Sequence, residues 1–397
     1  MNHINTNCHI HLPPNFSAFE TVEQAVHLAV EQDVRVLGAS NYYDYTVYGE
    51  FAAHCDTYGI LPLCGTEIIC MIDELRDAGM KINDPGNPGK MYLCGKGIRR
   101  FDPMTARAQE LMQTIRDNDA QRMASMIERL SEQFTMAGLE GGLSEADVKA
   151  MVVARHGSSL ATVFLQERHL AQAFQERLFE TVRHDERYAA LARLFGSAPK
   201  CATTDAVGVQ NEIRSHLMKA GKPAFVPETF VGFDHAYSLI LHLRGIPCYP
   251  TLADGASPIC GYEEDPDALI AATVARNIYC CELIPVRNSP EQVVRYVTAM
   301  RDAGLIVTAG TEHNTRDVIP LAPTCANGAP IPDHIHDIFW EGTCVVAAHQ
   351  YLTGRGKPAY IGENGQPAGN YPSNEARIAD LSALGAEIIR EVVGRRS

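Results

Sequence analysis

The chain has 397 residues, of which 46% are hydrophobic and 21% are charged, and its formal net charge is −14. This composition can bury a large core and is ordinary for a globular protein, whereas the acidic balance argues against broad binding of nucleic acid or of a membrane surface. The first residues lack an apolar signal core, and no apolar run approaches the roughly 20 residues of a membrane helix. We therefore expect no membrane contact and, by default, a cytoplasmic location.

Strands and helices alternate over the first hundred residues. Apolar strands are expected at 4–11, 34–40, 61–70 and 90–98, and helices at 21–31 and 51–58. This βαβ alternation predicts a parallel sheet, open or closed, with helices outside it. In such folds reactive side chains gather at the carboxyl ends of the strands.

A polar, helical stretch follows at about 105–220, with helices expected at 106–134, 144–154 and 162–182. We interpret it as a helical insertion, because the alternation then resumes. Helices at 234–243, 266–275 and 290–302 precede strands at 246–252, 278–285 and 305–309, and two more helices are expected at 333–352 and 374–395. The predicted organisation is a β/α domain from 1–104 and 221–330, an insertion at 105–220 and a helical extension at 331–397.

The twelve cysteines lie inside apolar runs, and the chain has no Cys-x-x-Cys pair. This pattern is typical of buried, reduced thiols rather than of a disulfide framework or a zinc knuckle.

His9 and His11 should point to the same side of the first strand, because side chains alternate with a period of two. Two imidazoles on one face can ligate one cation, although ordinary core or surface histidines are the alternative. Glu67 lies at the end of another apolar strand, and Glu312 with His313 follows the strand at 305–309. Carboxylates among apolar residues are costly to bury unless they are paired or bound to metal. Imidazole with carboxylate suits zinc, manganese or iron, and structural carboxylates are the alternative.

The order of these motifs resembles the PHP (polymerase and histidinol phosphatase) superfamily. Glu167-Arg168-His169-Leu170-Ala171 is similar to the Arg-Pro-His-x-Ala element of its bacterial nucleotide-phosphatase and exonuclease branch. Gly221-Lys222-Pro223-Ala224-Phe225-Val226-Pro227 is similar to the segment that leads that branch back into the barrel. The resemblance extends over about residues 4–316. It implies an α/β fold, a distorted parallel (β/α)7-type barrel with a helical insertion, and phosphate contacts by Arg168 and His169. An exposed charged pair is the alternative for these two.

Several metal ligands of that superfamily are replaced here. Asn41-Tyr42, with Asp44 nearby, stand in place of Asp-His, and Tyr92 stands in place of a histidine. Cys248-Tyr249-Pro250-Thr251 lacks the histidine of a His-Pro pair, and Glu312-His313-Asn314 replaces Asp-x-His. The ligands that remain, which would hold one or two ions but not three, are His9, His11, Glu67 and Glu312.

The leading hypothesis is a metal-dependent hydrolase of a small phosphoester or nucleotide, with a divalent metal (Zn, Mn or Fe) as cofactor. Two alternatives keep the barrel: a metal enzyme acting on a carbohydrate or carbonyl compound, and a non-catalytic binding protein. No long nucleic acid is expected as a partner, and homo-oligomerisation is left open. The expected catalytic residues are Asp44 and His313; the expected substrate-binding residues are Arg168, His169, Asn41, Tyr42 and Tyr92.

Overall fold

The computed structural model describes residues 4–315, 317–369 and 371–394, which pack into two compact units. The barrel unit, as we call it, contains the described residues of Met1–Leu12, Thr21–Met112 and Val231–Ser397. The helical unit contains Pro13–Glu20 and Gln113–Phe230, so the boundary falls inside α4 (Ala106–Met136). Among the described helices, none combines the length and apolar character needed to cross a membrane.

The strands of the barrel unit form two sheets. β1 (Asn5–Ile10), β2 (Val34–Ala39) and β3 (Leu61–Cys64) pair in parallel in that order. The second sheet has the order β6–β4–β5–β7–β8–β9. Its strands are β4 (Thr66–Met71), β5 (Lys90–Lys96), β6 (Val231–Gly232), β7 (Ile246–Thr251), β8 (Cys280–Leu283) and β9 (Ile306–Ala309).

β5 departs from the predicted parallel arrangement, because it runs antiparallel to both β4 and β7. The chain turns back on itself between β4 and β5, where α3 (Asp73–Asp77) lies and Ile72 N–H donates to Gly89 O at 2.8 Å. A returning connection of this kind gives an antiparallel pair, whereas a parallel pair needs a crossover. The β4–β6, β7–β8 and β8–β9 pairs are parallel.

The chain passes from the first sheet into the second at Gly65, between β3 and β4. Gly65 N–H donates to Ala39 O at 2.7 Å. A Cβ at Gly65 would lie 2.8 Å from Ala39 O and 2.9 Å from Gly95 O, which leaves no room for a side chain. The single strand predicted at 61–70 is therefore two strands separated by a glycine.

The two sheets also meet at their other ends, along β1 and β9. Ile10 forms an isolated bridge with Glu312, and the N–H groups of Thr311 and Glu312 donate to His9 O at 3.1 and 2.8 Å. The strands of the barrel unit therefore close on themselves, and the carboxyl ends of β1 and β9 are joined directly.

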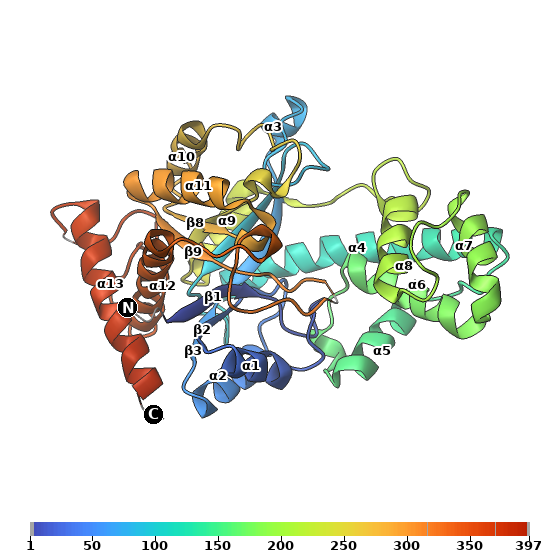
Figure 1. Cartoon of the computed structure of the whole chain (residues 1–397), viewed down its shortest axis with the longest axis horizontal. Coiled ribbons are helices and arrows are strands. Elements are labelled where there is room, and N and C mark those ends of the chain that lie inside the picture. Colours follow the sequence, from blue (N-terminus) through green and yellow to red (C-terminus); the bar gives the residue numbers. More distant parts are fainter. Residues whose placement is uncertain (1–3, 316, 370, 395–397) are drawn as a thin grey trace. The chain divides into compact units, whose positions relative to one another are not determined.

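The helices of the barrel unit begin where the sequence supplies caps. Thr21, Asp265 and Ser289 accept hydrogen bonds from backbone N–H groups of the first turns of α1, α10 and α11, and a proline follows the last two caps. Figure 1 shows these helices together with the strands. They are α1 (Val22–Glu31), α2 (Tyr48–Thr57), α9 (Phe233–His242), α10 (Pro266–Ala275), α11 (Pro290–Asp302), α12 (Asp333–Thr353) and α13 (Asn374–Gly394).

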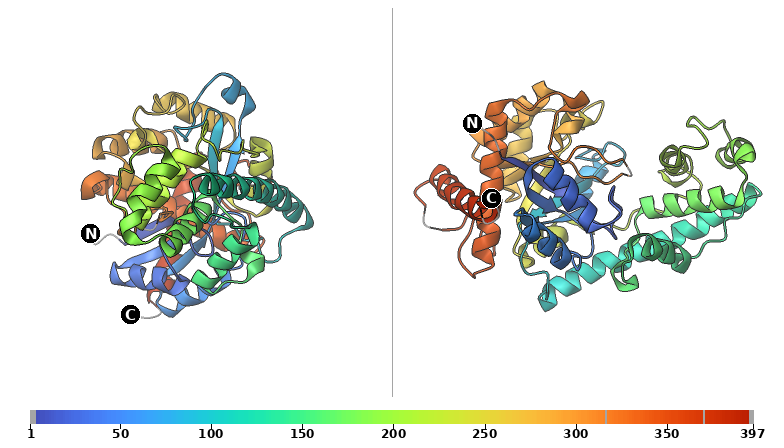
Figure 2. Two further views of the ribbon diagram at one scale, coloured as in Figure 1. Left: turned by 90° about the vertical axis from the view of Figure 1, so that its right-hand side faces the viewer. Right: turned by 60° about the horizontal axis from the view of Figure 1, so that its bottom comes forward.

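The segment predicted as a helical extension, 331–397, contributes α12 and α13 to the barrel unit. The two helices pack against each other, as the right-hand view of Figure 2 shows, and α12 contacts β9 and β1. Cys344, Val345 and Ala348 of α12 share one apolar cluster with Cys248 and Ile306 of the strands. The last part of the chain is thus packed into the core of this unit.

The helical unit has a separate apolar core. The rings of Phe134 on α4 and Phe174 on α6 lie 4.9 Å apart at its centre, packed with Leu130, Val209 and Ile213. Gln113–Phe230, rather than the predicted 105–220, is its main segment. Besides α4 it contains α5 (Glu145–His156), α6 (Glu167–Thr181), α7 (Arg187–Phe195) and α8 (Ala206–Ile213).

A buried carboxylate, Glu263, holds the loop that follows β7. Its oxygens accept hydrogen bonds from Tyr249 Oη and Ala253 N, both at 2.7 Å, and from Leu252 N at 3.1 Å. Burial raises the pKa of Glu263 to about 7, although these three donors act in the opposite direction. The carboxyl group therefore titrates near neutral pH inside the fold.

We expect Glu263 to make stability depend on pH. Its pKa of about 7 in the folded protein exceeds its ordinary value of 4.5, so the folded state binds the proton more tightly than the unfolded state. The stabilisation from this proton is complete below about pH 4.5 and is lost as the pH rises through about 7. Glu263→Gln should reduce the loss, as measured by urea unfolding of both proteins at several pH values. An identical pH profile for the two proteins would contradict this assignment.

Candidate metal centre

His9 on β1 and His11, just after the end of this strand, lie at the centre of the site. His9 and His11 are both fully buried, and their Nε2 atoms lie 3.4 Å apart. The ring of Tyr42 stacks on His11, with 5.2 Å between centroids and 2° between planes. The period of two along a strand places both imidazoles on one side, as the sequence predicts.

Glu67 on β4 completes a three-residue group with these histidines. Its Oε2 atom lies 3.1 Å from His11 Nε2 and 3.8 Å from His9 Nε2. Oε2 is buried and makes no hydrogen bond of acceptable geometry with any described residue. A buried carboxylate oxygen in this condition is costly unless something else binds it.

The three atoms fit a divalent metal ion. They lie within 4.8 Å of one another, with separations of 3.1, 3.4 and 3.8 Å. Ligand atoms on one tetrahedral zinc ion, at bonds of about 2.0–2.2 Å, are separated by about 3.3–3.6 Å. His9, His11 and Glu67 could therefore share one ion with little movement.

Glu282 and Lys96 support His9 from behind. Glu282 Oε1 lies 2.7 Å from His9 Nδ1, and Lys96 Nζ donates to Glu282 Oε2 at 2.5 Å and to Cys8 O at 3.1 Å. Burial acts to raise the pKa of Glu282, but Lys96 and His9 outweigh it and lower the pKa. An ionised Glu282 accepts a hydrogen bond from Nδ1–H of His9, and in this tautomer Nε2 keeps its lone pair for the site.

A second group of ligand atoms shares His9 and consists of His9, Cys94 and Glu282. Burial raises the pKa of the Cys94 thiol well above its ordinary value, and both Glu282 oxygens already bond to His9 and Lys96. An ion there would have to displace the Lys96 ammonium. The group with His11 and Glu67 is the better candidate.

Glu312 lies next to the histidines but pairs with an arginine. Arg287 donates to Glu312 Oε1 at 2.7 Å and to Oε2 at 2.5 Å, and Asn314 Nδ2 also donates to Oε2. Burial acts to raise the pKa of Glu312, yet Arg287 lowers it to about 2. Neither group of ligand atoms in the described residues includes Glu312. In this structure Glu312 is paired with an arginine, and its role as a metal ligand stays a prediction.

The other predicted site residues of this unit make different contacts. The Asn41 side-chain amide bonds both backbone groups of Leu12, at 2.8 and 2.9 Å, and so fixes the chain just beyond His11. Tyr42 covers the His11 ring. Asp44 is partly exposed and accepts a hydrogen bond from Thr46 N at 2.9 Å. Tyr92 lies on β5, with Lys90 Nζ 5.1 Å from its ring centroid. The substrate-binding and catalytic roles of these residues stay predictions.

His313 has both ring nitrogens engaged, Nδ1 with Thr311 Oγ1 at 2.7 Å and Nε2 with Ile319 O at 2.9 Å. Burial lowers the pKa of His313 to about 4, so the ring is neutral near pH 7. Its predicted part in proton transfer would require one of these bonds to break.

Arg168 and His169 belong to the helical unit, at the first turn of α6. His169 Nδ1 accepts a hydrogen bond from Gln166 N at 3.0 Å, and burial lowers the pKa of this ring to about 3. The Arg168 guanidinium lies 5.9 Å from the centroid of the Phe16 ring. Their contact with phosphate stays a prediction.

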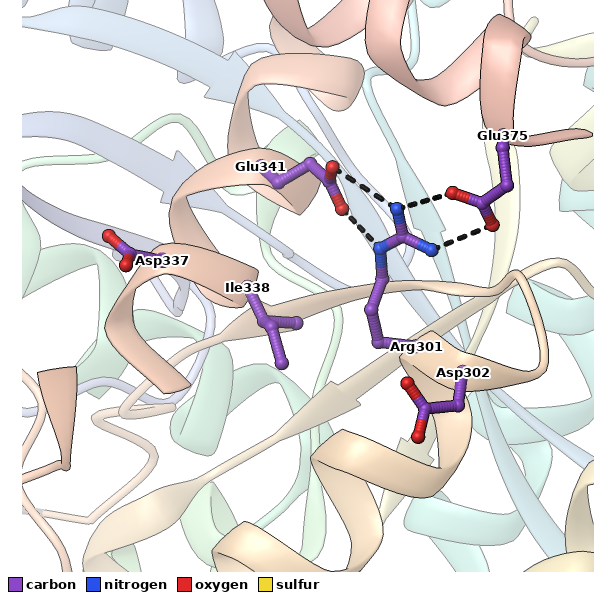
Figure 3. Close-up of a pocket in the computed structure, with 6 residues that line it drawn as sticks. All are labelled: Arg301, Asp302, Asp337, Ile338, Glu341 and Glu375. Atoms are coloured by element: carbon purple, nitrogen blue, oxygen red, sulfur yellow. Dashed lines mark hydrogen bonds and ion pairs between the residues drawn. The ribbon is translucent and has the colours of Figure 1, made fainter. Parts of the chain in front are cut away.

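A cavity of about 600 Å³ lies elsewhere in the barrel unit, among α11, α12 and α13 (Figure 3). Arg301 lines this cavity and donates hydrogen bonds to both Glu341 and Glu375. The lining residues include no histidine or cysteine, and the one arginine pairs with two carboxylates. The chemistry of the chain therefore points to the His9 cluster rather than to this cavity.

No protein-family model and no curated protein matches the sequence. Solved structures do resemble the fold. A chain from Bifidobacterium adolescentis assigned as a metal-dependent phosphoesterase has a TM-score of 0.52 and 17% identity, over 84% of this chain and 94% of that one. An amidohydrolase from Chromobacterium violaceum has a TM-score of 0.50 and 15% identity, over 84% and 96%. The protein is thus a mixed α/β protein similar in fold to barrel-type metal-dependent hydrolases.

Replacing Glu282 by Gln should weaken metal binding, because His9 loses the charged acceptor that orients its ring. Partners of this kind typically change metal affinity about 10- to 100-fold. Zinc titration against a competing chelator measures the affinity. Asp84→Asn is a matched control, since Asp84 pairs with Lys90 at 3.0 Å on the same strand as Lys96. Equal zinc affinity in Glu282→Gln and in the control would contradict the support role.

Proposed function

We propose that this chain is a metal-dependent hydrolase of small phosphoesters, with one divalent ion held by His9, His11 and Glu67. The observation that carries the proposal is the convergence of two imidazole nitrogens and one carboxylate oxygen at 3.1–3.8 Å in a buried place. The ligand set suits zinc, manganese or iron. Similarity in fold to a chain assigned as a metal-dependent phosphoesterase supports the same reaction class.

The charges around the site favour a single ion and an anionic substrate. Glu282 is neutralised by Lys96, and Glu312 by Arg287, so each of these carboxylates has its own cation. Among the described residues, the ion pairs of Glu67 are with the two histidines. With one divalent ion added, the site would carry a net positive charge suited to a phosphate.

A divalent ion in this position would lower the pKa of a bound water and offset the negative charge that develops on the phosphoryl oxygens. The protein holds the ligands ready for it. Glu282 fixes the His9 ring, Tyr42 covers one face of His11, and Asn41 anchors the backbone at Leu12. Asp44, partly exposed two residues after Tyr42, is our candidate for accepting a proton from the attacking water.

Elemental analysis of the purified protein, beside a hydrolysis assay on p-nitrophenyl phosphate and a panel of phosphorylated metabolites, tests the proposal. We expect about one zinc, manganese or iron ion per chain and metal-dependent phosphate release. His9→Ala/His11→Ala should lose both, whereas His54→Ala, which changes a histidine on α2, should lose neither.

A protein without metal, to which added manganese or zinc restores no phosphatase activity, would contradict the proposal. Bound metal without phosphate release would favour a carbohydrate or carbonyl substrate instead. Full biological function of His9→Ala/His11→Ala with the fold intact would favour a non-catalytic binding protein.

A further inference from the structure

Arg287 is a fixed cation at the edge of the candidate metal centre. Its two terminal nitrogens form a fork on the two Glu312 oxygens, at 2.7 and 2.5 Å. This bidentate geometry is the strongest that arginine makes with a carboxylate, and it leaves Glu312 no unbonded oxygen to offer a metal ion. Asn314, which donates to Glu312 Oε2, reinforces the arrangement.

The backbone fixes Glu312 relative to the metal-binding histidines. His11 N–H donates to Glu312 O at 2.8 Å, and Glu312 N–H donates to His9 O at the same distance. Glu312 and His313 both have positive φ angles, of 61° and 52°. Residues other than glycine adopt positive φ angles at a cost in conformational energy. Such residues persist where the surrounding structure imposes the conformation, often at functional sites.

The loop that carries Arg287 is also tied down. Asn288 Nδ2 donates to Leu252 O at 2.8 Å and to Asp254 Oδ1 at 2.9 Å, and Ser289 Oγ donates to Asp254 Oδ2 at 2.6 Å. The chain next to Arg287 is therefore fixed by these bonds, and the guanidinium itself is held by Glu312. Little side-chain freedom would be lost when a ligand binds it.

The side chain of Arg287 is more exposed than the carboxylates and the histidine that it lies beside. Its side chain is 37% exposed, whereas those of Glu312, Glu67 and His11 are 12%, 5% and 1% exposed. Glu312 takes one N–H from each terminal nitrogen of the guanidinium, and each of these nitrogens carries a second N–H. An incoming anion would meet these donors first.

We propose that Arg287, held by Glu312, serves as a built-in second cation that binds the phosphoryl group of the substrate beside a single metal ion on His9, His11 and Glu67. The inference rests on the proposed function and names the residue that recognises the phosphate. A guanidinium matches two phosphoryl oxygens at once, which a lysine ammonium cannot do.

Isothermal titration calorimetry with orthophosphate tests this on zinc-loaded protein, with the zinc content of each sample measured separately. We expect one ion per chain in wild type and in Arg287→Ala, and phosphate affinity about 10- to 100-fold lower in the variant. Arg287→Lys should recover only part of the affinity. Arg295→Ala, which removes an exposed arginine of α11, is the control and should bind as wild type does.

Two ions per chain in wild type, or an unchanged phosphate affinity in Arg287→Ala that still holds its zinc, would overturn the assignment of Arg287. Absence of zinc from wild type would instead overturn the metal centre, and normal phosphate binding without turnover would overturn the hydrolase. The separate zinc, phosphate and activity measurements therefore tell the failures apart.

Discussion

The hydrogen bond between His9 Nδ1 and Glu282 Oε1 selects the nitrogen that His9 presents to the site. The backbone of the same residue closes the barrel unit, because its carbonyl accepts the N–H groups of Thr311 and Glu312. Gly310 packs so closely there that a Cβ would lie 2.3 Å from His9 Cβ. His9 thus takes part both in the seam of hydrogen bonds that joins β1 to β9 and in the candidate metal centre. A change that opens the seam would also move the ligands.

Two buried or partly buried ion pairs surround this seam, Lys96 with Glu282 and Arg287 with Glu312. Removing charges from water costs several kcal/mol per ion, and the mutual attraction of a buried pair often only offsets that cost. Apolar side chains of similar size often fill such buried places at least as stably. We therefore interpret the pairs as serving the site: one orients His9, and the other presents a cation to solvent.

Much of this arrangement could be predicted from local sequence. α10 and α11 begin at the predicted residues, because Asp265-Pro266 and Ser289-Pro290 combine a cap with a proline at the first helical position. His9 and His11 share one side because side chains alternate along a strand. Glu67 lies near the beginning of β4, just after Gly65, and not at the end of a strand as the sequence predicts. The reversed direction of β5 was not predicted, since an apolar strand carries no mark of its direction. The role of Glu282 was not predicted either, because its partner His9 is 273 residues away in the sequence.

Glu312 shows why the number of ions is harder to predict than the presence of a site. A carboxylate after an apolar strand has the same sequence signature whether it faces a metal ion or an arginine. The partner determines which of the two roles the carboxylate has. Here the partner is Arg287, which lies in a different loop, 25 residues earlier in the sequence. What the structure adds is the pairing of each carboxylate: Glu282 and Glu312 have cations of their own, whereas the ion pairs of Glu67 among the described residues are with imidazoles. Our proposal of one divalent ion follows from this pairing, because one acidic ligand is left to share with two histidines and an arginine lies beside them.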